Sequence, residues 1–124
     1  MNERNHIFTL IADLGATDSE RQEEAVDALV KIGPPAVEAL ITAVNDGDAT
    51  ICANAAEALG HIGDKRALGP LIVALQDSDS QVVLTAINAL RRINDPLAVA
   101  PLIEFLRQDD LYLHFYPRQS GSEQ

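Results

Sequence analysis

Apolar residues along much of the chain follow the three- and four-residue spacing of helices that bury one face. In residues 48–62 this spacing collects aliphatic side chains on one face, namely Ile51, Ala55, Ala58, Leu59 and Ile62. The stretch that follows carries a second stripe of the same kind, namely Ala67, Leu68, Leu71, Ile72 and Leu75. Gly63 and Asp64 stand between the two stripes, where they predict a helix end and the cap of the next helix. The pattern therefore predicts a pair of helices.

This helix pair recurs along the chain. The run ALGHIG at 58–63 returns 31 residues later as ALRRIN at 89–94, and ALVKIG stands 30 residues before it at 28–33. The second helices repeat as well, since PLIVAL at 70–75 returns as PLIEFL at 101–106. Repeats of this length indicate helical units that bury their apolar faces by stacking on their neighbours.

We therefore predict an all-α fold, an α-α superhelix (solenoid) of about three and a half helix pairs within one domain over residues 1–116. The expected order is a lone helix, three helix pairs and a C-terminal cap, at residues 5–14, 18–46, 48–77, 79–108 and 109–116. Residues 117–124 are polar and are expected to form a flexible tail.

Aspartates recur at the boundaries between the predicted helices, namely Asp18, Asp46, Asp48, Asp77, Asp79, Asp109 and Asp110. Paired carboxylates are also ligands for hard cations. Their recurrence at every boundary favours helix capping and turn formation over a metal site. The spacing of Ser19 with Gln22, and of Ser78 with Gln81, further predicts capping boxes at two helix starts.

The run AAEALGHIGD at 55–64, followed by apolar residues at 71–72 and 74–75, resembles the HEAT-like repeat of phycobilisome lyases. The resemblance extends over about residues 18–108 and implies an α-solenoid. It also implies one of the roles in which this repeat occurs, either a bilin lyase subunit or a scaffold. The arginine that the family often has near the start of the first helix is replaced here by Gln22, Cys52 and Val83.

Charge and composition narrow the classes of partner. Nineteen acidic against nine basic residues give a formal net charge of −10, which repels the phosphates of nucleic acids and anionic membrane surfaces. We therefore expect neither nucleic acid nor membrane as a partner. A single cysteine excludes an internal disulfide, and the polar start lacks a signal-peptide pattern, so a cytoplasmic protein is expected.

No residues are predicted to be catalytic, to ligate a metal or to bind a cofactor. Iron-dependent deoxyhypusine hydroxylases resemble this repeat but carry His-Glu pairs, where this chain has Glu23-Glu24, Ala53-Asn54 and Leu84-Thr85. The histidines, at positions 6, 61 and 114, are scattered along the chain. Cys52 stands near a helix start, where a thiol can become reactive, but a structural role is favoured because no basic residue is near it in sequence.

The remaining candidates lie on the second helices, which in stacked helix pairs line the concave side. The predicted protein-binding residues there are Glu38, Thr42, Val73, Ala74, Gln76, Glu104 and Phe105. Aromatic residues near the C-terminus either cap the stack or contact another protein or a second copy of the chain, namely Tyr112, Phe115 and Tyr116.

Two functions follow from the sequence. The first is a non-catalytic scaffold that presents a concave helical surface to another protein, with a possible homodimer through the terminal repeats. The second, which rests on the family resemblance, is a bilin lyase subunit or a chaperone of chromophore attachment. Neither identifies the partner.

Overall fold

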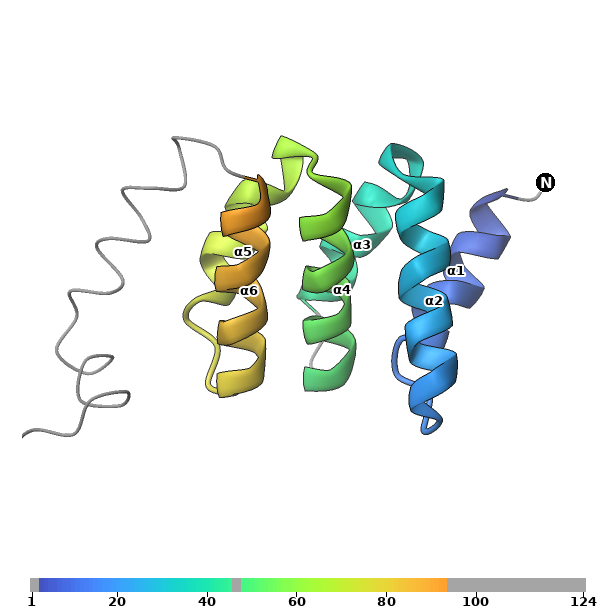
Figure 1. Ribbon diagram of the computed structural model, residues 1–124, viewed down its shortest axis with the longest axis horizontal. Coiled ribbons are helices and arrows are strands. Elements are labelled where there is room, and N and C mark those ends of the chain that lie inside the picture. Colours follow the sequence, from blue (N-terminus) through green and yellow to red (C-terminus); the bar gives the residue numbers. More distant parts are fainter. Residues whose placement is uncertain (1–2, 46–47, 94–124) are drawn as a thin grey trace, which may run out of the picture.

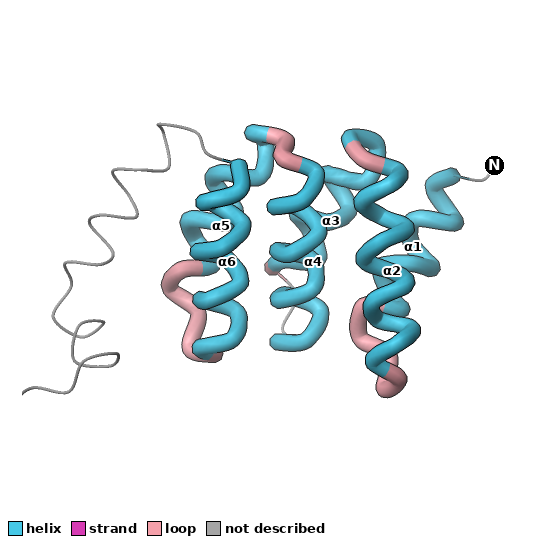
Figure 2. The backbone as a smooth tube through the Cα atoms, in the orientation of Figure 1, coloured by secondary structure: helices cyan, strands magenta, loops and turns pink. Residues whose placement is uncertain are grey.

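A computed structural model describes residues 3–45 and 48–93 (Figures 1 and 2). All regular elements in these ranges are helices, in the order α1 (Glu3–Asp13), α2 (Ser19–Ile32), the 3-10 helix η1 (Pro34–Ala36), α3 (Val37–Val44), α4 (Ala49–Ile62), the 3-10 helix η2 (Lys65–Ala67), α5 (Leu68–Ala74) and α6 (Ser80–Ile93). The all-α fold predicted from the sequence is confirmed. The second helix of the third predicted pair, the cap at 109–116 and the tail at 117–124 lie outside the described residues.

The helices form two layers, as Figure 1 shows. The first-helix layer consists of α2, α4 and α6, and the second-helix layer of α1, α3 and α5. Within the first layer, α4 packs against α2 on one side and α6 on the other, while α3 contacts both α1 and α5 in the second layer. Each helix pair therefore contacts the pair before it and the pair after it, as expected for stacked repeats.

The core consists of aliphatic side chains at equivalent positions of successive repeats. Leu29, Leu59 and Leu90 follow one another at the repeat spacing, and each is at most 1% exposed. Leu40 and Leu71 are equally buried in the second-helix layer. Burying one leucine side chain contributes about 1.5–3 kcal/mol, so these rows of leucines hold neighbouring pairs together.

Aspartates cap the helices of the first layer. The Asp18 carboxylate accepts a hydrogen bond from the Glu20 backbone N–H, and Asp48 accepts from the N–H groups of Thr50 and Ile51. Asp79 accepts from the Gln81 N–H at 2.8 Å. The capping role predicted for these aspartates is confirmed.

The predicted capping boxes are wrong. Ser19 is already the first helical residue, after the cap Asp18, and Ser78 precedes the capping aspartate Asp79. The Gln22 side chain donates a hydrogen bond to the Ala16 carbonyl instead of reaching back to a cap. Aspartate accepts from backbone N–H groups as well as serine does, so the shift by one residue follows from the choice of cap residue.

Gly60 allows α4 and α6 to approach closely. A Cβ atom at this position would lie 2.7 Å from the Ala89 Cα and 2.8 Å from the Ala89 Cβ. Both distances are shorter than carbon atoms can approach each other, and the Ala89 Cα is a backbone atom. The contact between these helices therefore requires glycine at position 60, whereas Gly63 is required for a different reason, its φ of +78° at the end of α4.

We predict that Gly60→Ala destabilises the chain by about 1–2 kcal/mol. The added methyl group forces the two helices apart, and this cost exceeds the helix propensity of alanine over glycine, roughly 1 kcal/mol. Gly69→Ala is the matched control, since a Cβ there meets no atom within 4 Å and the residue is also helical. Urea unfolding should show a lower midpoint for Gly60→Ala and an equal or higher one for Gly69→Ala. Equal effects of the two substitutions would contradict the close contact.

Candidate functional site

The predicted binding residues within the described part of the chain lie on or next to α3 and α5. Val73 is 63% exposed, the largest exposed fraction among the exposed large hydrophobic residues of the described ranges. Gln76 is exposed in the turn after α5, and Glu38 and Thr42 are exposed on α3. These residues share the second-helix layer, as the repeat spacing predicted.

Ala74 requires a correction. It is only 8% exposed and belongs to the hydrophobic core, because it lies on the side of α5 that also buries Leu71 and Leu75. Ala74 therefore offers little surface to a partner. Other predicted residues lie outside the described part of the chain, namely Glu104, Phe105, Tyr112, Phe115 and Tyr116.

A hollow of about 290 Å³ lies between the C-terminal ends of α3 and α5. Its walls combine apolar and polar side chains, namely Val44, Asn45, Val73, Ala74, Gln76 and Asp77. Sequence reasoning missed Val44 and Asp77 as parts of a binding surface, because the two helix ends come together only when the pairs stack. The exposed Val73 thus borders a concave feature rather than a flat helix surface. We call this hollow, together with the exposed predicted residues of the same layer (Glu38, Thr42, Val73 and Gln76), the second-helix surface.

Glu38 on this surface forms an ion pair with a residue that sequence reasoning also missed. Its carboxylate accepts a hydrogen bond from Arg66 Nη1 at 3.2 Å, and Arg66 Nη2 donates to the Pro34 carbonyl at 3.2 Å. The same guanidinium donates to Asp64 Oδ2 at 2.9 Å. Arg66 therefore links one helix pair to the next across the edge of the second-helix surface.

The Arg66–Asp64 contact changes the acidity of both groups. The side-chain hydrogen bond from Arg66 lowers the pKa of the Asp64 carboxyl below its usual 3.8, and the Arg66 backbone N–H acts in the same direction. The Asp64 carboxylate in turn raises the pKa of Arg66. The Arg66 side chain is exposed and the Asp64 side chain is partly exposed, so solvent screens the contact and it contributes modestly to stability.

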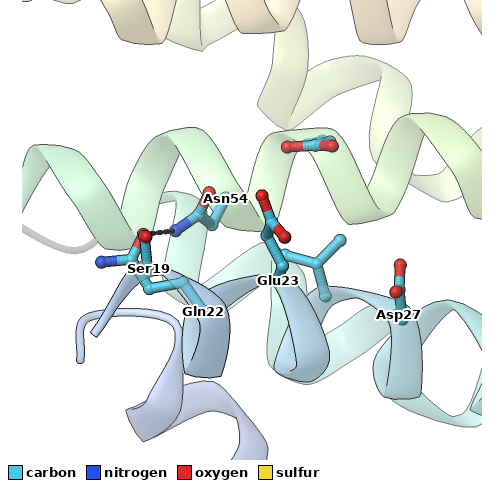
Figure 3. A pocket seen from close by; sticks show the side chains of 7 residues that line it. Ser19, Gln22, Glu23, Asp27 and Asn54 are labelled. Atoms are coloured by element: carbon cyan, nitrogen blue, oxygen red, sulfur yellow. Dashed lines mark hydrogen bonds between the residues drawn. The ribbon is translucent and has the colours of Figure 1, made fainter. Parts of the chain in front are cut away.

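The first-helix layer carries a second concave feature, which we call the first-helix groove. It consists of two hollows of about 350 and 260 Å³ that share Gln22, Asn54 and Glu57. The first hollow lies between α2 and α4, and Figure 3 shows Glu23 and Asp27 rising from α2 on the side that faces α4. The second continues toward α6, where it is bordered by Asp79, Gln81 and Thr85.

Two amide side chains fix the wall of this groove. Asn54 Nδ2 donates to the Leu14 carbonyl at 2.8 Å and to Gln22 Oε1 at 3.2 Å, the contact drawn in Figure 3. Gln22 Nε2 donates in turn to the Ala16 carbonyl. The amide donors are thus used to tie the turn after α1 to α2 and α4. These residues occupy different positions in their repeats, so no sequence pattern connects them.

Cys52 and His61, which the sequence analysis weighed as reactive residues, have surroundings typical of residues with a structural role. Cys52 is 2% exposed and packs within the core cluster of α4, as favoured from the sequence. His61 Nε2 lies 3.8 Å from Glu57 Oε2, one helical turn earlier on α4. Within residues 3–45 and 48–93, no three His, Cys, Asp or Glu side chains converge in a way that could hold a metal ion.

The stacked helix pairs define the chain as an α-solenoid, a protein whose repeats contact only their neighbours. Comparison with protein families identifies the kind of repeat. The family of HEAT repeats matches residues 37–113, more than half of the chain, and the PBS lyase HEAT-like repeat matches residues 22–46. The chain therefore belongs to the HEAT repeat family.

No curated protein matches the chain. Of the helices in the described ranges, none combines the length and the apolar character that crossing a bilayer requires.

We predict that Asp64→Asn lowers thermal stability at pH 7 and that the difference from the wild type shrinks as the pH falls below about 4. The folded-state pKa of Asp64 is lowered, so its contribution is present above the unfolded pKa and is lost as the pH falls through the folded pKa. Asparagine retains the cap to the Arg66 N–H, which isolates the effect of charge. Melting temperatures from pH 7 to pH 3 test this. A constant difference over that range would contradict it.

We further predict that Asn54→Ala destabilises the chain by about 1–3 kcal/mol, because the Leu14 carbonyl loses its donor in a partly buried setting. Asn88→Ala is the control, since Asn88 is exposed on α6 and its side chain accepts a hydrogen bond from Arg91 Nη2, three residues further along the same helix, at 3.0 Å. The control should change stability by less than about 0.5 kcal/mol. Urea unfolding at neutral pH measures both. Equal losses would show that the amide contacts are not specific.

Proposed function

We propose that this HEAT-repeat chain is a non-catalytic scaffold that holds another protein on the second-helix surface. The proposal rests on the exposure of Val73. This β-branched apolar side chain is 63% exposed and lies beside a hollow of about 290 Å³. An exposed apolar side chain next to a concavity is the arrangement in which a partner side chain gains most from burial. Exposed polar residues, Gln76 and Thr42, supply the rim that surrounds such contacts in protein interfaces.

The packing behind Val73 supports the same function. Leu71 is fully buried and Leu75 is 3% exposed, so the helix that carries Val73 is fixed in the core on both sides of that residue. A surface fixed in this way loses little conformational entropy when a partner binds. An exposed ion pair between Glu38 and Arg66 connects this helix pair with the neighbouring one. We therefore expect the second-helix surface to be pre-organised for binding.

The partner class follows from charge. A formal net charge of −10 disfavours nucleic acids and anionic membranes, so the proposed partner is a protein. The composition, with a single buried cysteine, suits a reducing compartment, and we place the interaction in the cytoplasm. Homodimer formation through the terminal repeats or the aromatic tail remains a prediction from the sequence.

We predict that Val73→Glu abolishes capture of the partner from extracts of the native cells by the tagged chain. A carboxylate at this position is charged and cannot be buried against an apolar partner side chain without a large cost. Leu84→Glu is the matched control, because Leu84 is also an exposed large hydrophobic residue, 43% exposed, but lies on α6 in the first-helix layer. The expected result is one protein captured by the wild type and by Leu84→Glu, and lost with Val73→Glu.

The Leu84→Glu control also shows which results would contradict the proposal. If Leu84→Glu loses the captured protein and Val73→Glu retains it, the binding surface lies on the first-helix layer. If both variants and the wild type capture the same proteins equally, Val73 has no part in binding. Circular dichroism of each variant shows whether the fold is retained.

A second candidate function is favoured by one finding, the match of residues 22–46 to the PBS lyase HEAT-like repeat. In that case the chain would take part in bilin attachment as a lyase subunit or chromophore chaperone. An absorbance titration with a free linear tetrapyrrole separates the two functions. A saturable spectral shift supports the lyase class, whereas an unchanged spectrum supports the scaffold.

A further inference from the structure

Phe8 on α1 is a large apolar side chain that the proposed function does not use. It is 59% exposed, and the other large hydrophobic residues exposed in the described ranges are Val73 and Leu84. Because α1 belongs to the second-helix layer, Phe8 and Val73 lie on the same layer of the array, at its two ends in the described part of the chain, whereas Leu84 lies on the other layer. An exposed aromatic ring has much apolar area to bury against a partner, so Phe8 is a candidate contact residue.

Phe8 and Val73 also occupy the same face of this layer. Ile7, Val37 and Leu68 are buried at equivalent positions of its three helices, and exposed residues stand one and five positions after each of them. These exposed residues follow one another at the repeat spacing, namely Phe8 and Ala12 on α1, Glu38 and Thr42 on α3, and Gly69 and Val73 on α5. Residues four apart lie on one side of a helix, so the six positions form two rows that cross α1, α3 and α5.

These two rows carry almost no charge, although the chain has a formal net charge of −10. Glu38 is the charged residue among the six, and Arg66 Nη1 already donates to its carboxylate at 3.2 Å. The exposed residues of α2, in the other layer, are largely charged, namely Glu20, Arg21, Glu23, Glu24 and Asp27. Charged residues are depleted and aromatic residues enriched at the centres of protein interfaces. The rows therefore complement an uncharged, apolar surface of a partner.

The rows also offer few hydrogen-bond donors. The Thr42 hydroxyl donates to the Glu38 carbonyl at 3.2 Å, and the hydroxyl of Thr9, next to Phe8, donates to the Asn5 carbonyl at 3.0 Å. The regular elements of the described residues are all helices, so these residues provide no strand edge with which a partner strand could pair. An extended segment buried on the rows would leave its own backbone N–H and C=O groups unpaired, whereas a helix pairs them internally. A helix is therefore the segment that fits.

We propose that the second-helix layer holds an amphipathic helix of the partner protein, lying across α1, α3 and α5 with one apolar side chain against Val73 and another against Phe8. Since α3 contacts both α1 and α5, two helix spacings separate the outer helices, roughly 16–20 Å in all. At a rise of about 1.5 Å per residue, the two apolar side chains stand roughly 11 residues apart in the partner, a separation that returns to the same face after three turns. The inference rests on the proposed function, since it names the segment that the scaffold holds.

Photocrosslinking from position 8 tests the span of the partner helix. A photoreactive phenylalanine derivative is placed at position 8 or 73 of the full chain in the native cells, and mass spectrometry maps the crosslinked residues of the partner. The expected result is one partner crosslinked from both positions, at sites roughly 11 residues apart in one segment. Position 6 is the matched control, because His6 is also exposed on α1 but lies on the other side of the helix from Phe8. It should give no crosslink to that segment.

The crosslinks separate this inference from the scaffold function. A crosslink from position 73 without one from position 8, or crosslinks to two distant segments, overturns the helix across the three rows of the array and leaves the scaffold function intact. Equal crosslinks from positions 6 and 8 overturn the contact with Phe8. The absence of any crosslink from position 73 contradicts both ideas.

Binding of the mapped segment provides a second measurement. A fluorescent peptide with the sequence of that segment is titrated into the full chain and followed by anisotropy. Phe8→Glu should weaken binding at least about tenfold, and His6→Glu, which also places a carboxylate on α1, less than about threefold. A proline midway between the two mapped residues of the peptide should weaken binding as well, because proline interrupts a helix. Equal effects of the two substitutions, or full binding by the proline peptide, would overturn the proposal.

Discussion

Each helix pair in this protein can bury its apolar stripe only against a neighbouring pair, and the other features of the fold follow from that constraint. Leu29, Leu59 and Leu90 stand at equivalent positions and are all but fully buried, because each closes the core between successive pairs. Gly60 extends the same principle to the backbone, where α4 and α6 approach too closely for a side chain. The polar contacts at the repeat boundaries, made by Asn54 and Arg66, then fix how one pair sits on the next.

Stacking of this kind leaves two layers with different surfaces. The second-helix layer presents the exposed Val73 beside a mixed hollow, and the first-helix layer presents a groove edged by carboxylates. Neither surface exists in an isolated helix pair, since each hollow is formed by side chains from neighbouring pairs. The binding capacity that we propose therefore depends on the same contacts that stabilise the array.

The sequence predicted the helices well because their signal is local and repeated. The stripe of Ala55, Leu59 and Ile62 defines α4, and the recurring aspartates define where the helices of the first layer begin. Val73 was found from the sequence since it is apolar at a position that its own helix does not bury. Ala74 was misplaced in the sequence analysis, although its spacing of three residues from Leu71 puts it on the same buried side of α5.

What the sequence could not show depends on how neighbouring pairs meet. The Arg66–Glu38 ion pair joins residues 28 positions apart, and the Asn54–Gln22 contact joins residues 32 positions apart, close to the repeat length but not equal to it. Neither pairing has a periodic signal of its own. The first-helix groove escaped prediction for the same reason, since its lining residues come from three separate helices.

The most direct test of the scaffold function is photocrosslinking in the native cells, with a photoreactive phenylalanine derivative placed at position 73 or, for comparison, at position 84. Both positions carry exposed apolar side chains, on opposite layers of the array. The scaffold function predicts a discrete crosslink to another protein from position 73 and none from position 84. A crosslink only from position 84, or none from either position, would contradict it.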